Sequence, residues 1–174
     1  IYTMKAVLAE LRYFKESISI ISELVSEVKF KATTQGLELV AMDPANVSMV
    51  IFKLLSSCFT QYQVQETEEL AINLNNLKQI LRRASGDDLL SLETTEDNKL
   101  KIILKGATTR SFSIPLLELE EKEQKVPELQ FPIAIETDSE LLSESVEDVS
   151  VVAESVTLLG EKGQLSVKAE GDLS

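Results

Sequence analysis

Two segments of this 174-residue chain carry the same hydrophobic pattern, 128 residues apart. The first segment has apolar residues at the spacing of an amphipathic helix, followed by two alternating stretches typical of strands. Adding 128 to each of these apolar positions reaches another apolar residue, without a gap. The pairs are Phe14 and Leu142, Ile18 and Val146, Ile21 and Val149, Val28 and Val156, Phe30 and Leu158, Leu37 and Leu165, Leu39 and Val167, and Ala41 and Ala169. Because the helix and strand periods both stay in phase, the pattern predicts an internal structural repeat.

A weaker echo of the first segment lies 63 residues after it. It pairs Phe14 with Leu77, Ile18 with Leu81, Ile21 with Ala84, Leu37 with Leu100, Leu39 with Ile102, and Ala41 with Leu104. The strand between the helix and these last positions does not keep phase. We interpret residues 1–116 as one domain of two helix-plus-strands halves, and residues 132–174 as part of a second domain. Completing that domain needs a chain of about 244 residues, so the sequence is expected to be a fragment or natural truncation of a two-domain protein.

Periodicity and turn residues predict the individual elements. Strands are expected at 2–8, 28–32, 37–41, 47–53, 59–63, 70–72, 89–93, 99–105, 109–116, 133–136, 156–159 and 165–169. Helices are expected at 10–25, 75–85 and 139–153. Residues 117–130 hold five acidic and two basic residues, one proline and no sustained period, which indicates an extended linker. These elements predict an α+β fold.

Composition excludes several kinds of chemistry. The chain has no His, which excludes Ser-His-Asp and Cys-His catalytic arrangements and His-based zinc sites. Its one Cys, Cys58, excludes an intrachain disulfide. No phosphate-binding or dinucleotide-binding glycine motif occurs, and acidic pairs such as Asp87-Asp88 are interpreted as solvated loop residues. No apolar run is long enough to span a bilayer. We therefore expect neither an enzyme nor a cofactor or metal, and no membrane partner.

Four strings, in order, resemble the sliding-clamp family, and within it archaeal proliferating cell nuclear antigen. They are LELVAMDPANV at 37–47, NLNNLKQILRRA at 73–84, TRSFSIPL at 109–116 and VPEL at 126–129. The resemblance implies a DNA-clamp, or processivity, fold of repeated βαβββ units, with helices on one face of antiparallel sheets. It assigns residues 1–116 to the first clamp domain, 117–131 to the interdomain linker and 132–174 to a partial second clamp domain.

The function implied by the resemblance is that of a sliding clamp. Such a subunit forms a ring around duplex DNA, independently of sequence, and tethers DNA polymerase and other replication and repair enzymes. The implied partners are other clamp subunits in a homotrimer or heterotrimer, and clients such as polymerase, flap endonuclease, ligase and the clamp loader. The implied location is the cytoplasm, at the nucleoid, or the nucleus in a eukaryote. Two alternatives stay open: a clamp-like interaction scaffold that does not load on DNA, and a plain repeat-built domain without a nucleic-acid role.

Charge is segregated in a way that suits encirclement. The net charge of −12 argues against electrostatic wrapping of DNA by the whole surface, yet residues 73–86 carry +3 and the remainder −15. The resemblance implies that Lys78, Arg82 and Arg83 face DNA, and that Lys15 does so too. From the residues alone, they are interpreted as an ordinary solvated helix face. Arg12 is a weaker candidate because Glu16 and Glu23 share its face. The predicted third helix departs from the family, since residues 139–154 hold five acidic residues and no basic one, and this raises the hypothesis of a heteromeric ring.

Two further surfaces follow from the resemblance. Clients of the family insert bulky apolar anchors into a pocket beneath the linker, and the matching positions here are Met42, Val47, Val126, Pro127, Leu129 and Phe131. The alternative is that Met42 and Val47 are ordinary core and loop residues. The alternating strand at 109–116 is expected to be an exposed edge that pairs with a neighbouring subunit. The predicted interface residues are Thr109, Arg110, Ser111, Phe112, Ser113 and Ile114.

Overall fold

A computed structural model describes residues 2–120 and 124–171 of the chain. It divides into two units, Ile1–Val126 and Pro127–Ser174, each described here by itself. The predicted linker segment at 121–123 lies outside the described residues.

The first unit contains two successive βαβββ halves. The first half consists of β1 (Met4–Leu8), α1 (Arg12–Ile21), β2 (Glu27–Thr33), β3 (Gly36–Met42) and β4 (Met49–Leu55). A short 3-10 turn, η1 (Ser56–Cys58), and β5 (Gln61–Val64) connect it to the second half. The second half consists of β6 (Glu68–Asn73), α2 (Leu74–Arg82), β7 (Leu89–Thr94), β8 (Lys99–Lys105) and β9 (Thr109–Pro115).

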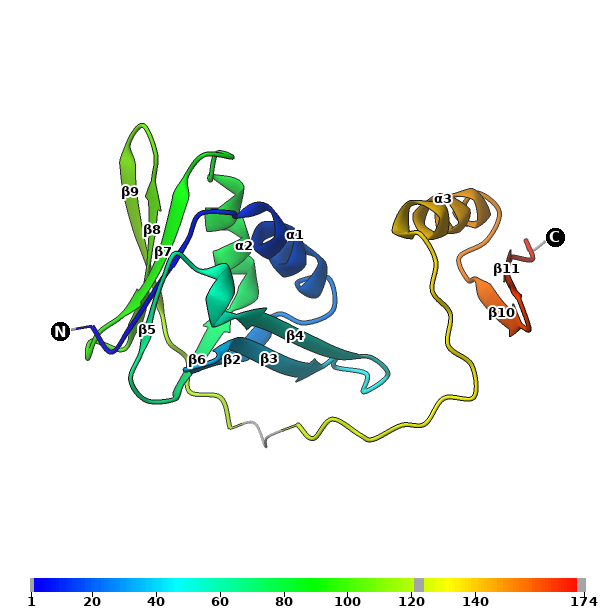
Figure 1. The fold of residues 1–174 in the computed structure, drawn as a ribbon, viewed down its shortest axis with the longest axis horizontal. Coiled ribbons are helices and arrows are strands. Elements are labelled where there is room, and N and C mark those ends of the chain that lie inside the picture. Colours follow the sequence, from blue (N-terminus) through cyan, green and yellow to red (C-terminus); the bar gives the residue numbers. More distant parts are fainter. Residues whose placement is uncertain (1, 121–123, 172–174) are drawn as a thin grey trace. The chain divides into compact units, whose positions relative to one another are not determined.

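The two halves exchange their first strands. One sheet has the order β5-β1-β7-β8-β9 and the other the order β4-β3-β2-β6, with antiparallel pairing throughout. Thus β1 of the first half joins the strands of the second, and β6 of the second half joins those of the first. Figure 1 shows α1 and α2 next to each other in the angle between the two sheets. The expected α+β architecture, with helices on one face of antiparallel sheets, is confirmed.

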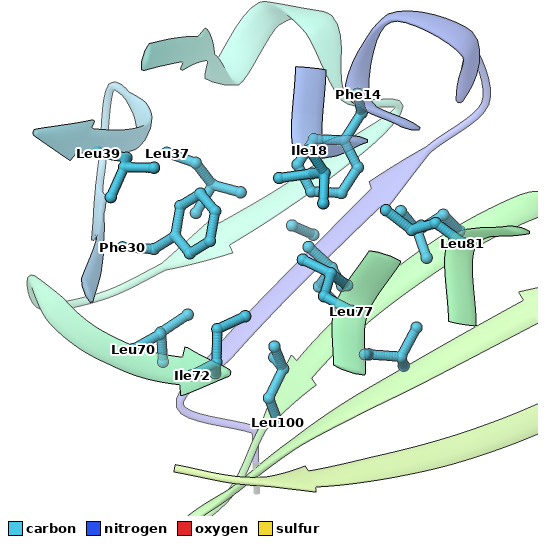
Figure 2. Packing of buried hydrophobic residues seen from close by; sticks show 14 of the residues in the cluster. Phe14, Ile18, Phe30, Leu37, Leu39, Leu70, Ile72, Leu77, Leu81 and Leu100 are labelled. Atoms are coloured by element: carbon cyan, nitrogen blue, oxygen red, sulfur yellow. The ribbon is translucent and has the colours of Figure 1, made fainter. Parts of the chain in front are cut away.

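One apolar core lies beneath the helix pair. Phe14 and Ile18 of α1 and Leu77 and Leu81 of α2 are buried, and they belong to one cluster with the inward residues of both sheets. Figure 2 shows how these side chains meet those of the sheets, including Phe30, Leu37, Leu39, Leu70, Ile72 and Leu100. Burying a side chain of this size contributes about 1.5 to 3 kcal/mol, so the shared core fixes the two helices side by side.

Local contacts set the ends of the helices. The Asn73 side chain accepts hydrogen bonds from the backbone N–H groups of Asn75 (3.0 Å) and Asn76 (3.4 Å), which caps α2 at its first residue. Helix α1 ends at Ile21, four residues before the predicted end. There the backbone bonds tighten, because the N–H groups of Glu23 and Leu24 donate three residues back, to the carbonyls of Ile20 and Ile21.

The strand pairing explains why the 63-residue echo loses phase. Phe30 lies opposite Leu39 in the first half, and Leu92 lies opposite Ile102 in the second. Leu92 therefore comes 62 residues after its counterpart Phe30, whereas Ile102 comes 63 residues after its counterpart Leu39. Counted between core residues, the second half is therefore one residue shorter from helix to first strand (Leu81 to Leu92 against Ile18 to Phe30) and one residue longer from the first strand to the next.

The second unit repeats the pattern of α1, β2 and β3. It contains α3 (Ser139–Ser150), β10 (Thr157–Glu161) and β11 (Gln164–Lys168). Leu158 lies opposite Val167, as Phe30 lies opposite Leu39, so the register of the hairpin is preserved at the 128-residue offset. The predicted structural repeat between residues 14–41 and 142–169 is confirmed.

Two expectations for the second unit are wrong. Residues 133–136 form no strand, because none of the described strands pairs with them, and β10 and β11 pair only with each other. The side chains of Ile133 and Ile135 instead lie next to Gly160. The apolar positions predicted to face inward on α3 are not buried, and Val146 is 40% exposed, because the described residues of this unit, 127–171, contain no second helix and sheet to cover them.

Candidate functional site

A groove runs between α1 and α2. It has a volume of roughly 560 Å³, and three of the four residues predicted to face DNA line it: Lys15, Lys78 and Arg82. Arg12, Glu10 and Glu16 line it too. The helix spacing produces this arrangement, because the core residues of each helix fix its inward face and leave these cations on the flanks that face each other.

Ion pairs divide the groove cations into two classes. Arg12 pairs with Glu16 at 3.2 Å, and Lys78 pairs with Glu23 at 3.3 Å. The Lys78 side chain is only 15% exposed, whereas that of Glu23 is 75% exposed. In the described part of the chain, none of the ion pairs involves Lys15 or Arg82. Lys15 and Arg82 are therefore the groove cations outside these ion pairs, and the negative charge of Glu10 lies in the same groove.

Arg83 lies apart from the other predicted DNA-facing residues. Its side chain is exposed, and it lines a second hollow, between α2 and β9, together with Asn76, Gln79 and the apolar side chains of Phe112 and Ile114. The structure therefore brings Lys15, Lys78 and Arg82 together, and it places Arg83 beside the strand that was predicted to form a subunit interface.

Strand β9 has the edge position predicted for it, at one end of its sheet. Ile114 is buried and Phe112 half-buried, whereas Thr109, Ser111 and Ser113 are exposed. This alternation places one side of the strand on the core and presents the other to solvent.

Arg110, the remaining predicted interface residue, is engaged within the first unit. Its guanidinium donates to the Arg83 carbonyl at 2.7 Å and to the Asp88 carboxylate at 2.5 Å. Asp88 is buried, and its Oδ2 atom also accepts the Ser85 N–H at 2.8 Å. These bonds tie β9 to the C-terminal end of α2, which carries Arg82 and Arg83.

An outward apolar face lies at the end of the β3–β4 hairpin. Met42 pairs with Met49, and Val40 pairs with Ile51, so the four side chains share the face of the sheet opposite to the core. Val47, in the connecting loop, is 82% exposed. Sequence reasoning identified Met42 and Val47 but missed Val40, Met49 and Ile51. The strand register supplies them, because residues directly opposite each other in an antiparallel pair point to the same side.

The other predicted pocket residues lie along the extended segment. Val126 ends the first unit and is 48% exposed. Pro127, Leu129 and Phe131 begin the second unit and are also exposed, Phe131 at 75%. The segment thus presents apolar side chains to solvent within each unit.

Metal-binding clusters and membrane-spanning helices are both absent from the described residues. No group of three or more Cys, Asp or Glu side chains in residues 2–120 and 124–171 is arranged to hold a metal ion. Among the helices of this part of the chain, none is both long and apolar enough to cross a membrane.

Comparison with known proteins gives consistent matches. Residues 3–126 match the family model of the proliferating cell nuclear antigen N-terminal domain. The DNA polymerase sliding clamp of Pyrococcus furiosus is 37% identical over 159 residues, covering 91% of this chain and 64% of that protein. The DNA polymerase sliding clamp of Nanoarchaeum equitans is 35% identical over 173 residues, covering 98% of this chain and 70% of that protein. The chain therefore spans about two thirds of the length of these relatives.

Solved structures agree with the architecture. The PCNA of Thermococcus kodakaraensis superposes with a TM-score of 0.88 and 26% identity, covering 99% of this chain and 70% of that chain. A chain of the PCNA2–PCNA3 complex of Sulfolobus tokodaii superposes with a TM-score of 0.86 at 23% identity, which is a likeness of fold. With the family model covering most of the sequence and relatives above one third identity, the chain belongs to the proliferating cell nuclear antigen family of DNA polymerase sliding clamps.

Proposed function

We propose that this chain is a subunit of a sliding clamp that encircles duplex DNA, and that it tethers DNA polymerase and other replication and repair enzymes without catalysing a reaction itself. The observation that carries the proposal is the groove between α1 and α2, which collects Lys15, Lys78 and Arg82 in a chain of net charge −12. A ring holds DNA topologically, so it needs only weak, sequence-independent phosphate contacts along its inner wall.

The proposal extends to the organisation of the ring. Residues 1–116 form the first clamp domain, 117–131 the linker and 132–174 part of the second domain. The free edge of β9, at residues Thr109–Ile114, pairs with a strand of a neighbouring subunit, because an unpaired edge offers free backbone N–H and C=O groups. The protein acts in the compartment that holds the DNA, which is the cytoplasm in a cell without a nucleus.

The ring is either homomeric or heteromeric, and α3 favours the second form. Helix α3 carries Glu140, Glu144, Glu147 and Asp148 and no basic residue. Carboxylates facing a phosphate backbone repel it, so subunits of different sequence would supply the missing positive charge. The Sulfolobus tokodaii structure, whose chains form a complex of PCNA2 with PCNA3, supports this form.

We further propose that the outward face of the β3–β4 hairpin binds clients. A short peptide with bulky apolar anchors fits a surface that contains Met42, Val47, Met49 and Ile51. Val126, Pro127, Leu129 and Phe131 are proposed client-binding residues as well, because their apolar side chains are exposed and the extended chain offers backbone groups to a bound peptide.

Retention on circular DNA tests the proposal. The chain, with its partner subunits and clamp loader, is loaded on closed circular duplex DNA, which is then cut once with a restriction enzyme. A clamp stays on the circle through a high-salt wash and is lost from the linear product. Dissociation from both forms contradicts encirclement. It favours the alternative of an interaction scaffold that does not load on DNA, for which the acidic α3 is the supporting feature.

A further inference from the structure

Four hydrogen bonds, each of which involves Asp43, hold the loop between β3 and β4. Residues 43–46 form a turn in which the Asn46 N–H donates to the Asp43 carbonyl at 2.9 Å. Pro44 fixes the first central position of this turn. Asn46 has a φ of 55°, a left-handed conformation that Asn tolerates and branched residues do not. The Asp43 N–H donates to the Ser48 carbonyl at 3.0 Å and closes the loop.

The Asp43 carboxylate organises the second part of the loop. Its Oδ1 atom accepts the backbone N–H of Val47 at 2.7 Å and that of Ser48 at 2.8 Å. The pKa of Asp43 lies below its usual value, chiefly because the Ser48 N–H stabilises the carboxylate. The side chain is therefore ionised at neutral pH, and a carboxylate makes stronger hydrogen bonds to amides than a neutral group does.

These bonds determine where Val47 stands. Val47 is 82% exposed, so no packing against the core fixes it, and its position depends on the backbone of the loop. That backbone is held by Asp43 at the Val47 amide itself. The loop joins the two strands that carry Met42 and Met49, so it presents Val47 at the end of the apolar face.

We propose that Asp43 is the positioning residue of the client-binding face, and that its carboxylate fixes the 43–48 loop so that Val47 is presented in place to a bulky apolar anchor of a client peptide. The proposal rests on the proposed client-binding function. Its physical basis is preorganisation: a loop that is already ordered pays less entropy on binding than one that must become ordered.

The test compares variants of the full chain by isothermal titration calorimetry against one synthetic peptide that has two aromatic anchors. Asp43→Ala is expected to weaken binding about tenfold. Asp43→Asn restores most of the affinity, because the amide oxygen still accepts both N–H groups. Asp97→Ala is the matched control, since Asp97 also accepts a hydrogen bond in a β-hairpin turn, with Asn98 at a φ of 54°, but in the β7–β8 hairpin. It leaves the affinity unchanged.

A second perturbation acts on the same loop from a different residue. Asn46→Val cannot hold a φ of 55° without strain and is expected to weaken binding as Asp43→Ala does, whereas Asn46→Gly retains the affinity. The double variant Asp43→Ala/Asn46→Val loses little more than either single change, because both open one loop. Amide hydrogen exchange at Val47 and Ser48 is expected to accelerate in Asp43→Ala, while the thermal unfolding midpoint stays within about 2 °C.

The outcomes separate the two proposals. If the wild-type chain does not bind the peptide, the client-binding function fails, and the role of Asp43 fails with it. If the wild-type chain binds and Val47→Asp abolishes binding, but Asp43→Ala and Asn46→Val bind normally, only the role of Asp43 is overturned. If Asp43→Asn binds as weakly as Asp43→Ala and both unfold at lower temperature, Asp43 serves general stability and the proposal is also overturned.

Discussion

Arg110 and Asp88 form an ion pair that joins the edge strand β9 to the turn after α2, with 2.5 Å between Nη2 and Oδ2. The Asp88 side chain is 5% exposed and that of Arg110 is 31% exposed, so the pair is largely shielded from water. Gly106 makes room for it, because a Cβ at this position would meet Oδ1 of Asp88 at 2.0 Å.

Asp88→Ala is expected to destabilise the first unit by about 2 to 4 kcal/mol. The change leaves the Arg110 guanidinium without its anion and the Ser85 N–H without its acceptor, and an unpaired buried polar group costs more than the pair itself contributes. Urea unfolding followed by circular dichroism measures the loss. Asp87→Ala, at the exposed neighbouring position, is the control and shifts the midpoint little. Equal midpoints for the two variants would show that the ion pair contributes nothing to stability.

Gly36→Ala is expected to destabilise the chain by about 2 to 4 kcal/mol. Gly36 has a φ of 148°, and a Cβ there would lie 2.1 Å from the Leu54 carbonyl oxygen of β4. Backbone strain and a clash with backbone atoms therefore act together. Gly86→Ala is the matched control, because a Cβ at Gly86 meets no atom within 4 Å. Thermal unfolding of both variants checks the prediction, which is contradicted if Gly36→Ala melts with Gly86→Ala.

The same glycine shows how far sequence reasoning reaches. The hydrophobic pattern predicts the 128-residue repeat because burial imposes the same period on both copies. Position 164, equivalent to Gly36, is Gln, and it is tolerated because β11 pairs only with β10 in the described part of the second unit. The strand prediction at 133–136 is wrong for a related reason, because no described strand pairs with this segment. Apolar alternation shows that a segment can join a sheet, but the neighbouring strands decide whether it does.

Contacts between residues that are far apart in the chain could not be predicted from the sequence. The periodicity of α2 predicted an outward flank with Lys78, Arg82 and Arg83, yet it did not show that Glu23 neutralises Lys78. Nor did it show that Arg83 turns toward β9 while Arg82 lines the groove. Such pairs depend on the crossing of α1 and α2, which the packing of the shared core determines.

Tyr62 is expected to make stability fall between pH 10 and about pH 12. Burial, together with the negative charge of Glu38, raises the pKa of Tyr62 to about 12 from 10.0, and its hydroxyl donates to the Thr33 carbonyl at 2.7 Å. Below pH 10 the hydroxyl is protonated in both states, so its full contribution is present. Above pH 10 the unfolded chain loses this proton first, and stability falls until the folded state loses it near pH 12.

The measurement is the difference between wild type and Tyr62→Phe in urea unfolding at several pH values. After allowance for the partial exposure of Tyr62, the hydroxyl contributes about 1 kcal/mol below pH 10, and this difference vanishes by about pH 12. Tyr13→Phe is the control, since Tyr13 is 68% exposed on α1. A difference for Tyr62→Phe that does not change with pH would contradict the assigned pKa.

Arg82→Ala is expected to reduce the salt dependence of duplex DNA binding. Each phosphate contact contributes about 0.9 to the slope of log K against log salt concentration, so the slope falls by about one and binding weakens at low salt. Lys101→Ala removes the same charge from β8, where the buried neighbours Leu100 and Ile102 direct Lys101 away from the core. Fluorescence anisotropy with one DNA duplex over a salt series compares them. Identical slopes for the two variants would remove Arg82 from the DNA-facing surface.

Val126→Asp is expected to weaken the binding of a client peptide without unfolding the first unit. Val126 is 48% exposed, so a carboxylate there remains hydrated in the free chain and the stability changes little. In the complex the carboxylate would have to lose water against an apolar anchor, which lowers the affinity about tenfold or more. Calorimetry with the aromatic peptide measures the affinity, and circular dichroism melting confirms the fold. Glu128→Asp, two residues along the exposed segment, is the control because it keeps the local charge. Unchanged affinity in Val126→Asp would confine the client site to the β3–β4 face.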